Sequence, residues 1–194
     1  MKKIEYKVLP KITEELLQCR FDCFNESLGY YKSAGSALEV YDDFSFHIQF
    51  TIDNKIAGYT RLTPCPYNYM ELNKPDGLSL PNDSFTLEMG RTIVMPEFRG
   101  MRLLNLILLV GLEICENLGY KLVIGNESYE AHLKMPKSIG FKFMNIIEDF
   151  KMPGSEKGYH TFYLISCDLI RTNKFRELKL NEFKKYFNDN GFLI

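Results

Sequence analysis

One stretch of sequence, residues 85–125, decides the fold: FTLEMGRTIVMPEFRGMRLLNLILLVGLEICENLGYKLVIG. Its first part, Phe85–Met95, has the pattern of a strand, and Pro96 ends it. The segment Met101–Leu118 is apolar on nearly all sides, which predicts a buried helix. Lys121–Gly125 is then a short buried strand. A strand, a helix and a second strand in this order predict a right-handed parallel crossover.

Further strands and helices are expected on both sides of this unit. Residues alternate in polarity from Phe44 to Phe50, which is typical of a strand with one buried face, and Asp53-Asn54 supplies a hairpin turn. Two segments, Tyr30–Ala37 and Pro64–Asp83, are expected to be loops, and long loops in compact domains are often functional. The expected strands are Glu5–Leu9, Phe44–Thr51, Lys55–Thr63, Phe141–Lys151 and Tyr159–Asp168, and the expected helices are Thr13–Leu28, Glu130–Ser138 and Asn173–Asn188.

Strands interleaved with helices predict an α/β protein in which a mixed (α+β) sheet is flanked by helices. The length of 194 residues suits one domain of ordinary size. We expect this domain to occupy residues 1–170. Residues 171–194 are expected to form an amphipathic C-terminal helix that packs on or beside it.

The composition excludes several classes of protein. The chain is 45% hydrophobic and has a net charge of −1, from 24 Lys and Arg against 25 Asp and Glu. This is typical of a globular protein and argues against a dedicated nucleic-acid binder. The N-terminal segment lacks the apolar core of a signal peptide, and the longest apolar run, Leu103–Val110, is too short to span a bilayer. We therefore expect a soluble, cytoplasmic protein without a membrane span.

The cysteines and histidines indicate neither a disulfide framework nor a metal site. The number of cysteines is odd, no C-x-x-C pair occurs, and the histidines are scattered without ligand spacing. Buried thiols are the expected state of the cysteines. The residues are Cys19, Cys23, Cys65, Cys115 and Cys167, with His47, His132 and His160.

The junction between the Phe85–Met95 strand and the next helix carries a family resemblance. The run Val94–Leu104 resembles the acyl-thioester-binding motif of the GNAT N-acyltransferase superfamily, and Ile139-Gly140-Phe141 resembles its later Gly-Phe pair. The N–H groups at a helix N-terminus attract phosphate oxygens, which in this superfamily belong to coenzyme A. The resemblance implies a GNAT-like fold and an acyl thioester as cosubstrate. The implied thioester-binding residues are Val94, Arg99, Gly100 and Arg102.

The sequence also departs from the pattern of the superfamily at three positions, two in this motif and one further along the chain. Arg102 and Leu104 replace small residues, usually glycines, that allow the backbone to approach the pyrophosphate. Pro136 stands where many relatives carry a tyrosine that protonates the leaving thiol. Ordinary surface charge is the alternative interpretation of Arg99 and Arg102.

A second group of motifs resembles the acyl-homoserine-lactone (autoinducer) synthases. It consists of four elements in the same order as in that family, with Tyr30 in place of a tryptophan and Glu39 in place of an aspartate. The same elements recur in long-chain N-acyl amino acid synthases and ornithine-lipid acyltransferases, which use acyl carrier protein thioesters. The run Glu88–Arg99 is more similar to this wider branch. The four elements are Arg20–Tyr30, Glu39–Asp42, Gly58–Leu62 and Leu87–Arg91.

These motifs suggest roles in acyl transfer to an amine. Glu88 would take a proton from the acceptor ammonium and Arg91 would act beside it, while a backbone N–H near Ile93–Met95 would meet the oxyanion. Glu88 and Arg91 are three residues apart and so lie on opposite faces of an ideal strand. A bulge is therefore needed before both can face one site, and a salt bridge between them is the alternative. The implied substrate-binding residues are Arg20, Phe24, Tyr30, Asp42 and Arg61.

Arg61 and Arg91 stand in strands that are otherwise apolar. A buried arginine needs a partner, which Glu39, Asp42 or Asp43 can supply. One hypothesis is a buried network that also clamps the carboxylate of an amino-acid acceptor, and the alternative is a purely structural network. A plain core position is likewise the alternative interpretation of Phe24.

The C-terminal segment has a basic excess between Arg171 and Lys185. Because acyl carrier proteins are acidic, this helix is a candidate docking surface for one. A solvated helix packed on the edge of the sheet is the alternative. The basic residues are Arg171, Lys174, Arg176, Lys179, Lys184 and Lys185, against Glu177 and Glu182.

Together these features predict an N-acyltransferase. It would move an acyl group from acyl-phosphopantetheine on acyl carrier protein, or from acyl-CoA, to the amine of a small metabolite, with an amino acid favoured. No permanently bound cofactor is expected. The first alternative is an acyl-homoserine-lactone synthase that uses S-adenosylmethionine. The second is a catalytically degenerate binding protein of the same fold.

Overall fold

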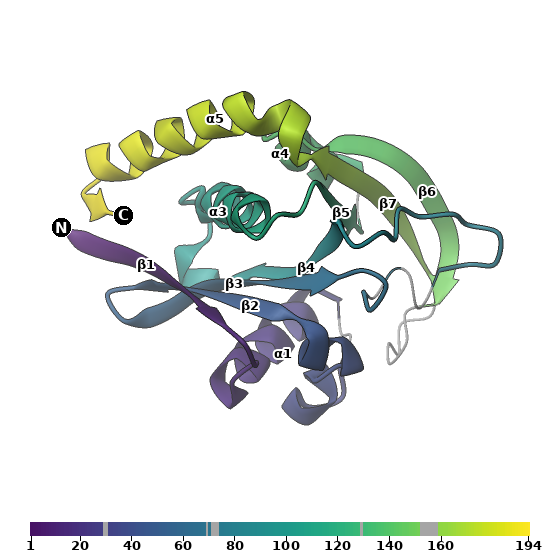
Figure 1. Cartoon of the computed structure of the whole chain (residues 1–194). Helices are drawn as coiled ribbons and strands as arrows, with labels where there is room; N and C mark the ends of the chain where they lie inside the picture. Colours follow the sequence, from purple (N-terminus) through teal and green to yellow (C-terminus); the bar gives the residue numbers. More distant parts are fainter. Residues whose placement is uncertain (29–30, 69, 71–73, 129, 152–158) are drawn as a thin grey trace.

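A computed structural model describes residues 1–28, 31–68, 70, 74–128, 130–151 and 159–194. Its strands form one eight-stranded mixed sheet in the order β6-β7-β5-β4-β3-β2-β1-β8 (Figure 1). The strands are β1 Lys2–Leu9, β2 Phe46–Ile52, β3 Lys55–Pro64, β4 Thr86–Val94, β5 Leu122–Glu127, β6 Lys142–Lys151, β7 Tyr159–Asp168 and β8 Phe192–Leu193.

Helices of both α and 3-10 type connect these strands. The α-helices are α1 Glu14–Leu28, α3 Leu103–Asn117, α4 Lys134–Lys137 and α5 Leu169–Asp189, and the 3-10 helices are η1 Ala34–Ala37, η2 Val40–Phe44, η3 Pro96–Phe98 and η4 Glu130–Leu133. None of the helices in the described part of the chain has both the length and the apolar character needed to cross a membrane.

The predicted crossover is present between β4 and β5, which are parallel neighbours. Their register pairs run from Thr86 with Leu122 to Glu88 with Ile124. Beyond this point β4 continues beside β3, and β5 continues beside β7. The two parallel strands therefore separate after Glu88 and Ile124, in the middle of the sheet.

Helices cover both faces of the sheet. Helices α3 and α5 lie on one face and α1 lies on the other (Figure 1). The main apolar core is between the sheet and α3, where residues such as Leu106, Ile107 and Leu112 are almost wholly buried, as the apolar character of this helix predicts. A smaller apolar cluster, which includes Leu16 and Tyr59, holds α1 against the other face.

Several element boundaries differ from the expected ones. Phe44 ends η2 instead of starting a strand, and its side chain is 50% exposed. Helix α3 begins at Leu103, because Gly100 and Arg102 have φ values of +80° and +59°, which are not helical. Helix α5 begins at Leu169, where the Asp168 carboxylate caps it by accepting a hydrogen bond from the Arg171 N–H.

Two other expected segments also differ. The segment Tyr30–Ala37, expected to be a loop, contains the 3-10 turn η1, which Ser33 caps. The expected helix Glu130–Ser138 is divided into η4 and α4. Tyr30 lies outside the described residues.

Candidate functional site

Two adjoining cavities lie where β4 and β5 separate. Cavity 1, of about 290 Å³, is lined by 89–92 of β4 and by 125–128 at the end of β5. Cavity 2, of about 540 Å³, lies between α1, the end of β4 and the start of α3. Phe24, Thr92 and Leu104 line both cavities, so the two lie side by side.

Cavity 1 connects the two faces of the sheet. Leu108 of α3 and Met135 of α4 line it on one face, and Phe24 of α1 lines it on the other. Strand separation creates this passage, because a continuous β4–β5 ladder would close it. Two molecules that approach from opposite faces can therefore meet in it.

The start of α3 forms one wall of cavity 2. The residues predicted to bind a thioester, Val94, Arg99, Gly100 and Arg102, all line this cavity. The positive φ values of Gly100 and Arg102 turn the backbone into the helix N-terminus, where the first N–H groups have no partner within the helix. The Arg99 Nε donates to the Val94 carbonyl oxygen at 3.3 Å, and the Arg102 guanidinium lies 4.9 Å from the centre of the Tyr186 ring.

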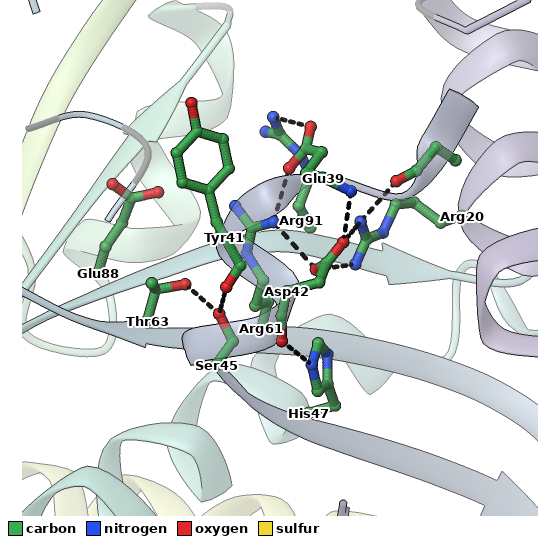
Figure 2. A network of polar contacts seen from close by, with 12 residues as sticks. Arg20, Glu39, Tyr41, Asp42, Ser45, His47, Arg61, Thr63, Glu88 and Arg91 are labelled. Carbon is green, nitrogen blue, oxygen red and sulfur yellow. Dashed lines mark hydrogen bonds and ion pairs between the residues drawn. The ribbon is translucent and has the colours of Figure 1, made fainter. Parts of the chain in front are cut away.

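A buried network of three arginines and two carboxylates lies beside cavity 1 (Figure 2). Asp42 binds Arg20 through both carboxylate oxygens, at 2.9 and 2.8 Å, and it binds Arg61 at 3.1 Å. Glu39 binds Arg61 at 2.6 Å and receives three further contacts, of 2.6 to 3.1 Å, from Arg91. The network joins α1, η2, β3 and β4 into one polar unit.

The charges of this network set its ionisation. Burial alone would raise the pKa of Glu39, but the guanidinium groups of Arg91 and Arg61 outweigh it and hold that pKa far below its usual range. The pKa of Asp42 is likewise lowered, because hydrogen bonds and charge from Arg20 outweigh burial. Both carboxylates are therefore ionised at neutral pH, and the five groups carry a net charge of +1.

The β-bulge needed to bring Arg91 to this site is present. Arg61 pairs with Gly90 and Tyr59 pairs with Ile93, so β4 contains one extra residue here. Arg91 adopts a φ of +54°, which is uncommon for a residue with a side chain. The bulge places Arg91 on Glu39 and in the lining of cavity 1.

The other predicted catalytic residue, Glu88, lies in the last position at which β4 pairs with β5. Its side chain is almost wholly buried, and its Oε2 accepts hydrogen bonds from Asn68 Nδ2 at 3.0 Å and from the Met70 N–H at 2.7 Å. Burial raises the pKa of Glu88, although the nearby charge of Arg61 opposes this. In the described part of the structure, Glu88 lines neither cavity 1 nor cavity 2.

The predicted substrate-binding residues divide into two groups. Phe24 lines both cavities. Arg20, Asp42 and Arg61 are wholly or almost wholly buried in the network and do not line these cavities in the described structure. Arg20 also donates to the Ala37 carbonyl at 2.8 Å and to the Tyr59 hydroxyl at 2.7 Å, which fixes α1 to the adjoining segments.

A polar group at the end of β5 was not predicted as part of the site. Asn126, Glu127 and Ser128 line cavity 1 together with His132 of η4. Burial raises the pKa of Glu127 to about 7. The signal was available, because these polar residues directly follow a buried strand and ligands often bind at the carboxyl ends of strands. Among the described residues, no three His, Cys, Asp or Glu side chains are grouped so that they could hold a metal ion.

The strand order, the separation of β4 and β5 and the helix that follows β4 define a GNAT-type fold. Solved structures confirm this. A CoA-dependent acyl-homoserine lactone synthase, MesI, aligns with a TM-score of 0.65 at 14% identity, over 97% of this chain and 95% of that one.

Two acetyltransferases align similarly. The ribosomal-protein-S18-alanine N-acetyltransferase from Escherichia coli has a TM-score of 0.60 at 11% identity, over 84% of this chain and 94% of that chain. A GNAT family acetyltransferase from Elizabethkingia anophelis with acetyl-CoA bound has a TM-score of 0.61 at 15% identity, over 86% of this chain and 98% of that chain. No protein-family model and no curated protein matches the sequence. The likeness therefore establishes the fold.

Proposed function

We propose that this protein is an N-acyltransferase that takes an acyl group from an acyl thioester. The thioester is either acyl-CoA or the acyl-phosphopantetheine of an acyl carrier protein. The observation that carries the proposal is the position of the two adjoining cavities. Cavity 2 lies at the N-terminus of α3, and it adjoins cavity 1, which lies between β4 and β5. A long, narrow thioester fits such a path, with its phosphates at the helix and its acyl group between the strands.

The lining of the cavities suits the parts of a thioester. Arg99, Arg102 and the first N–H groups of α3 offer positive charge and donors to phosphates. After Glu88, the edge of β4 that faces β5 has no register partner in the described residues, so its backbone can bind the pantetheine arm and the oxyanion. The N–H of Met95 is already used, because it donates to the Ala57 carbonyl.

The buried network supports an acceptor that carries a carboxylate, such as an amino acid. Three guanidinium groups face two carboxylates, and within the described residues the Nε and Nη2 of Arg61 have no hydrogen-bond partner. Arg91 brings this excess positive charge to the lining of cavity 1. A carboxylate there would balance the charge, with Arg91 facing it and Arg61 holding Glu39 in position.

A second candidate is the acyl-homoserine-lactone synthase reaction with S-adenosylmethionine. The alignment with MesI over nearly the whole of both chains supports it, as does the order of the four N-terminal motifs. The carboxylate of S-adenosylmethionine would meet the same positive charge. Both candidates begin with the same acyl transfer to an amine.

A thiol-release assay tests the proposal. Acetyl-CoA, octanoyl-CoA, palmitoyl-CoA and palmitoyl acyl carrier protein are each supplied with a pool of the twenty amino acids or with S-adenosylmethionine, and products are identified by mass spectrometry. We expect thiol release that depends on the acceptor, with an N-acyl amino acid as product. An acyl-homoserine lactone would favour the second candidate. Measurable thioester binding without turnover would instead indicate a degenerate binding protein.

A further inference from the structure

The carboxyl end of β5 places an acidic side chain in the reaction passage. Glu127 is the last residue of β5, and its Cα pairs with that of Tyr163 in β7. Its side chain lines cavity 1 and is 24% exposed.

Glu127 stands beyond the point where the two parallel strands separate. The last register pair joins Glu88 to Ile124, so Glu127 is three residues further along β5. Gly125 marks the narrow start of the gap, because a Cβ atom there would come within 3.1 Å of the Met89 carbonyl oxygen. Arg91 and Thr92 line the same cavity from β4. A group held between the strands therefore has the β4 bulge on one side and Glu127 on the other.

Glu88 has a different setting, although it is the other buried glutamate of this region. It lies where β4 and β5 are still paired, and its Oε2 accepts hydrogen bonds from Asn68 and Met70. An ammonium group in cavity 1 meets Glu127 without displacing any of these contacts.

His132 continues the path from Glu127 toward solvent. Its Nδ1 lies 3.9 Å from the Glu127 Oε2, and its side chain is 61% exposed. A proton that reaches Glu127 therefore has a second titratable acceptor close by, at the mouth of cavity 1.

We propose that Glu127 is the proton acceptor for the amine substrate and that His132 carries the proton to solvent. The inference rests on the proposed acyl transfer. Glu127 takes one proton from the ammonium group, and the neutral nitrogen then forms a bond with the thioester carbonyl carbon as the carbon–sulfur bond breaks. Of the two protons that the nitrogen loses, one leaves through Glu127 and His132, and the other ends on the departing thiol.

The ionisation of Glu127 suits this role. Burial raises its pKa to about 7, so near neutral pH a large fraction is ionised and can accept a proton. The titratable or charged groups around it are His132 from η4, Tyr163 from β7 and Arg91 from the facing wall of cavity 1.

The test compares E127Q and E127D with E88Q, and with E130Q as a matched control on the exposed η4 surface. Initial rates are measured between pH 5.5 and 9 with the thioester and acceptor that the wild type uses. We expect E127Q to lower kcat at least about 100-fold and to lose the increase in rate around pH 7, while E127D keeps part of both. The Kd for the thioester and the melting temperature of E127Q should match the wild type, and E88Q should keep the increase around pH 7.

The outcomes separate the two proposals. If the wild type releases thiol and E127Q does so at the wild-type rate with the same pH profile, the role of Glu127 is excluded and the proposed function stands. If E88Q, rather than E127Q, loses the increase around pH 7, Glu88 is the proton acceptor. If the wild type binds thioesters but turns over none of them, the proposed function fails, and the role of Glu127 fails with it.

Discussion

At the scale of single residues, Asp42 is the centre of the buried network. Its carboxylate binds Arg20 and Arg61 and also accepts a hydrogen bond from the Glu39 N–H at 2.8 Å. Removal of one partner from a buried ion pair leaves an uncompensated charge, which is costly in a low-dielectric interior. Asp42 is therefore the carboxylate that Arg20 and Arg61 share.

We expect D42N to lower the free energy of unfolding by about 3–5 kcal/mol, because two buried guanidinium groups lose a charged partner. The measurement is urea denaturation followed by circular dichroism. The adjacent D43N is the control, since Asp43 is exposed, and should change stability by less than about 0.5 kcal/mol. Equal stability of D42N and the wild type would contradict the structural role of the network.

The stabilising effect of Asp42 should depend on pH. Because the folded-state pKa of Asp42 is lowered, its contribution is fully present above the unfolded pKa of about 3.9 and is lost as the pH falls through the folded pKa. The difference in unfolding free energy between wild type and D42N should therefore be constant from pH 5 to 8 and shrink below pH 4.

Arg61 distinguishes a substrate-related network from a purely structural one. We expect R61K to lower kcat/KM at least about tenfold through a higher KM for the acceptor, because lysine lacks the planar fork of donors of arginine. The melting temperature should change little, because the lysine ammonium keeps the positive charge. Steady-state kinetics and calorimetry measure the two effects, and R171K on the exposed side of α5 is the control. A parallel loss of melting temperature and activity would indicate a structural role only.

At the scale of elements, glycines set how closely α3 approaches the sheet. A Cβ atom at Gly58 of β3 would lie 2.9 Å from the Ile93 carbonyl oxygen and would also strike the Ile107 side chain. A Cβ atom at Gly111 of α3 would lie 2.7 Å from the end of the flexible Met89 side chain. A fixed backbone atom resists the first change, whereas a side chain can move away from the second.

We expect G58A to destabilise the protein by about 1–3 kcal/mol, as an overpacked core does. G111A should stay within about 1 kcal/mol of the wild type, because the higher helix propensity of alanine offsets the displacement of Met89. Denaturation in urea measures both. Comparable losses in the two variants would show that α3 has no freedom to adjust.

The basic surface of α5 is smaller than its sequence indicates. Arg176 is buried, and its guanidinium binds Glu116 of α3 at 2.7 Å and the Leu169 carbonyl at 2.8 Å, so it fastens α5 to the core. Lys174 and Lys185 are exposed, and they are eleven residues apart, or about three helical turns, which places them on one side of the helix. A docking surface for acyl carrier protein would use such lysines.

If α5 binds acyl carrier protein, K174E/K185E should raise the KM for an acyl carrier protein thioester about tenfold and leave the KM for the matching acyl-CoA unchanged. The control is K7E/K11E, which makes the same change of charge at two exposed lysines, one in β1 and one between β1 and α1. An unchanged KM for the carrier protein thioester would favour a solvated helix that only packs on the domain.

At the scale of the whole molecule, the apolar interior encloses every cysteine. All five cysteines are described, and all are buried thiols that form no disulfide. Burial raises the pKa of Cys19 to about 11 and raises the pKa of Cys115 further. Because the thiolate is the reactive form, both protonation and burial protect these residues.

We expect the native protein to react with Ellman's reagent at pH 8 much more slowly than the unfolded protein, in which all five thiols react within minutes. Absorbance at 412 nm measures the reaction with and without guanidinium chloride. Reductant should leave the melting temperature unchanged. Rapid reaction of a native thiol would show that part of the core opens frequently.

The crossover, the succession of strands and helices along the chain and the burial of α3 could be predicted because they depend on local patterns. The apolar run from Leu103 to Cys115 and the strands beside it follow from the spacing of apolar residues alone. The requirement for a bulge between Glu88 and Arg91 was also accessible, since it follows from the two-residue period of a strand. The start of α3 was missed by two residues, because the conformation of Arg102 depends on its surroundings.

The sequence by itself determined a mixed sheet flanked by helices, because apolar periodicity is a property of the chain, and its motifs resembled those of the GNAT superfamily. It also indicated the arginines and carboxylates of the network, because an arginine in an otherwise apolar strand needs a partner. Only the tertiary structure decided which acidic residue faces the passage. Glu88 and Glu127 both belong to central strands. The strands separate after the pair of Glu88 with Ile124, so Glu88 stays in the paired region, whereas Glu127 lies beyond it and lines cavity 1. Where two strands part depends on the packing of the whole sheet.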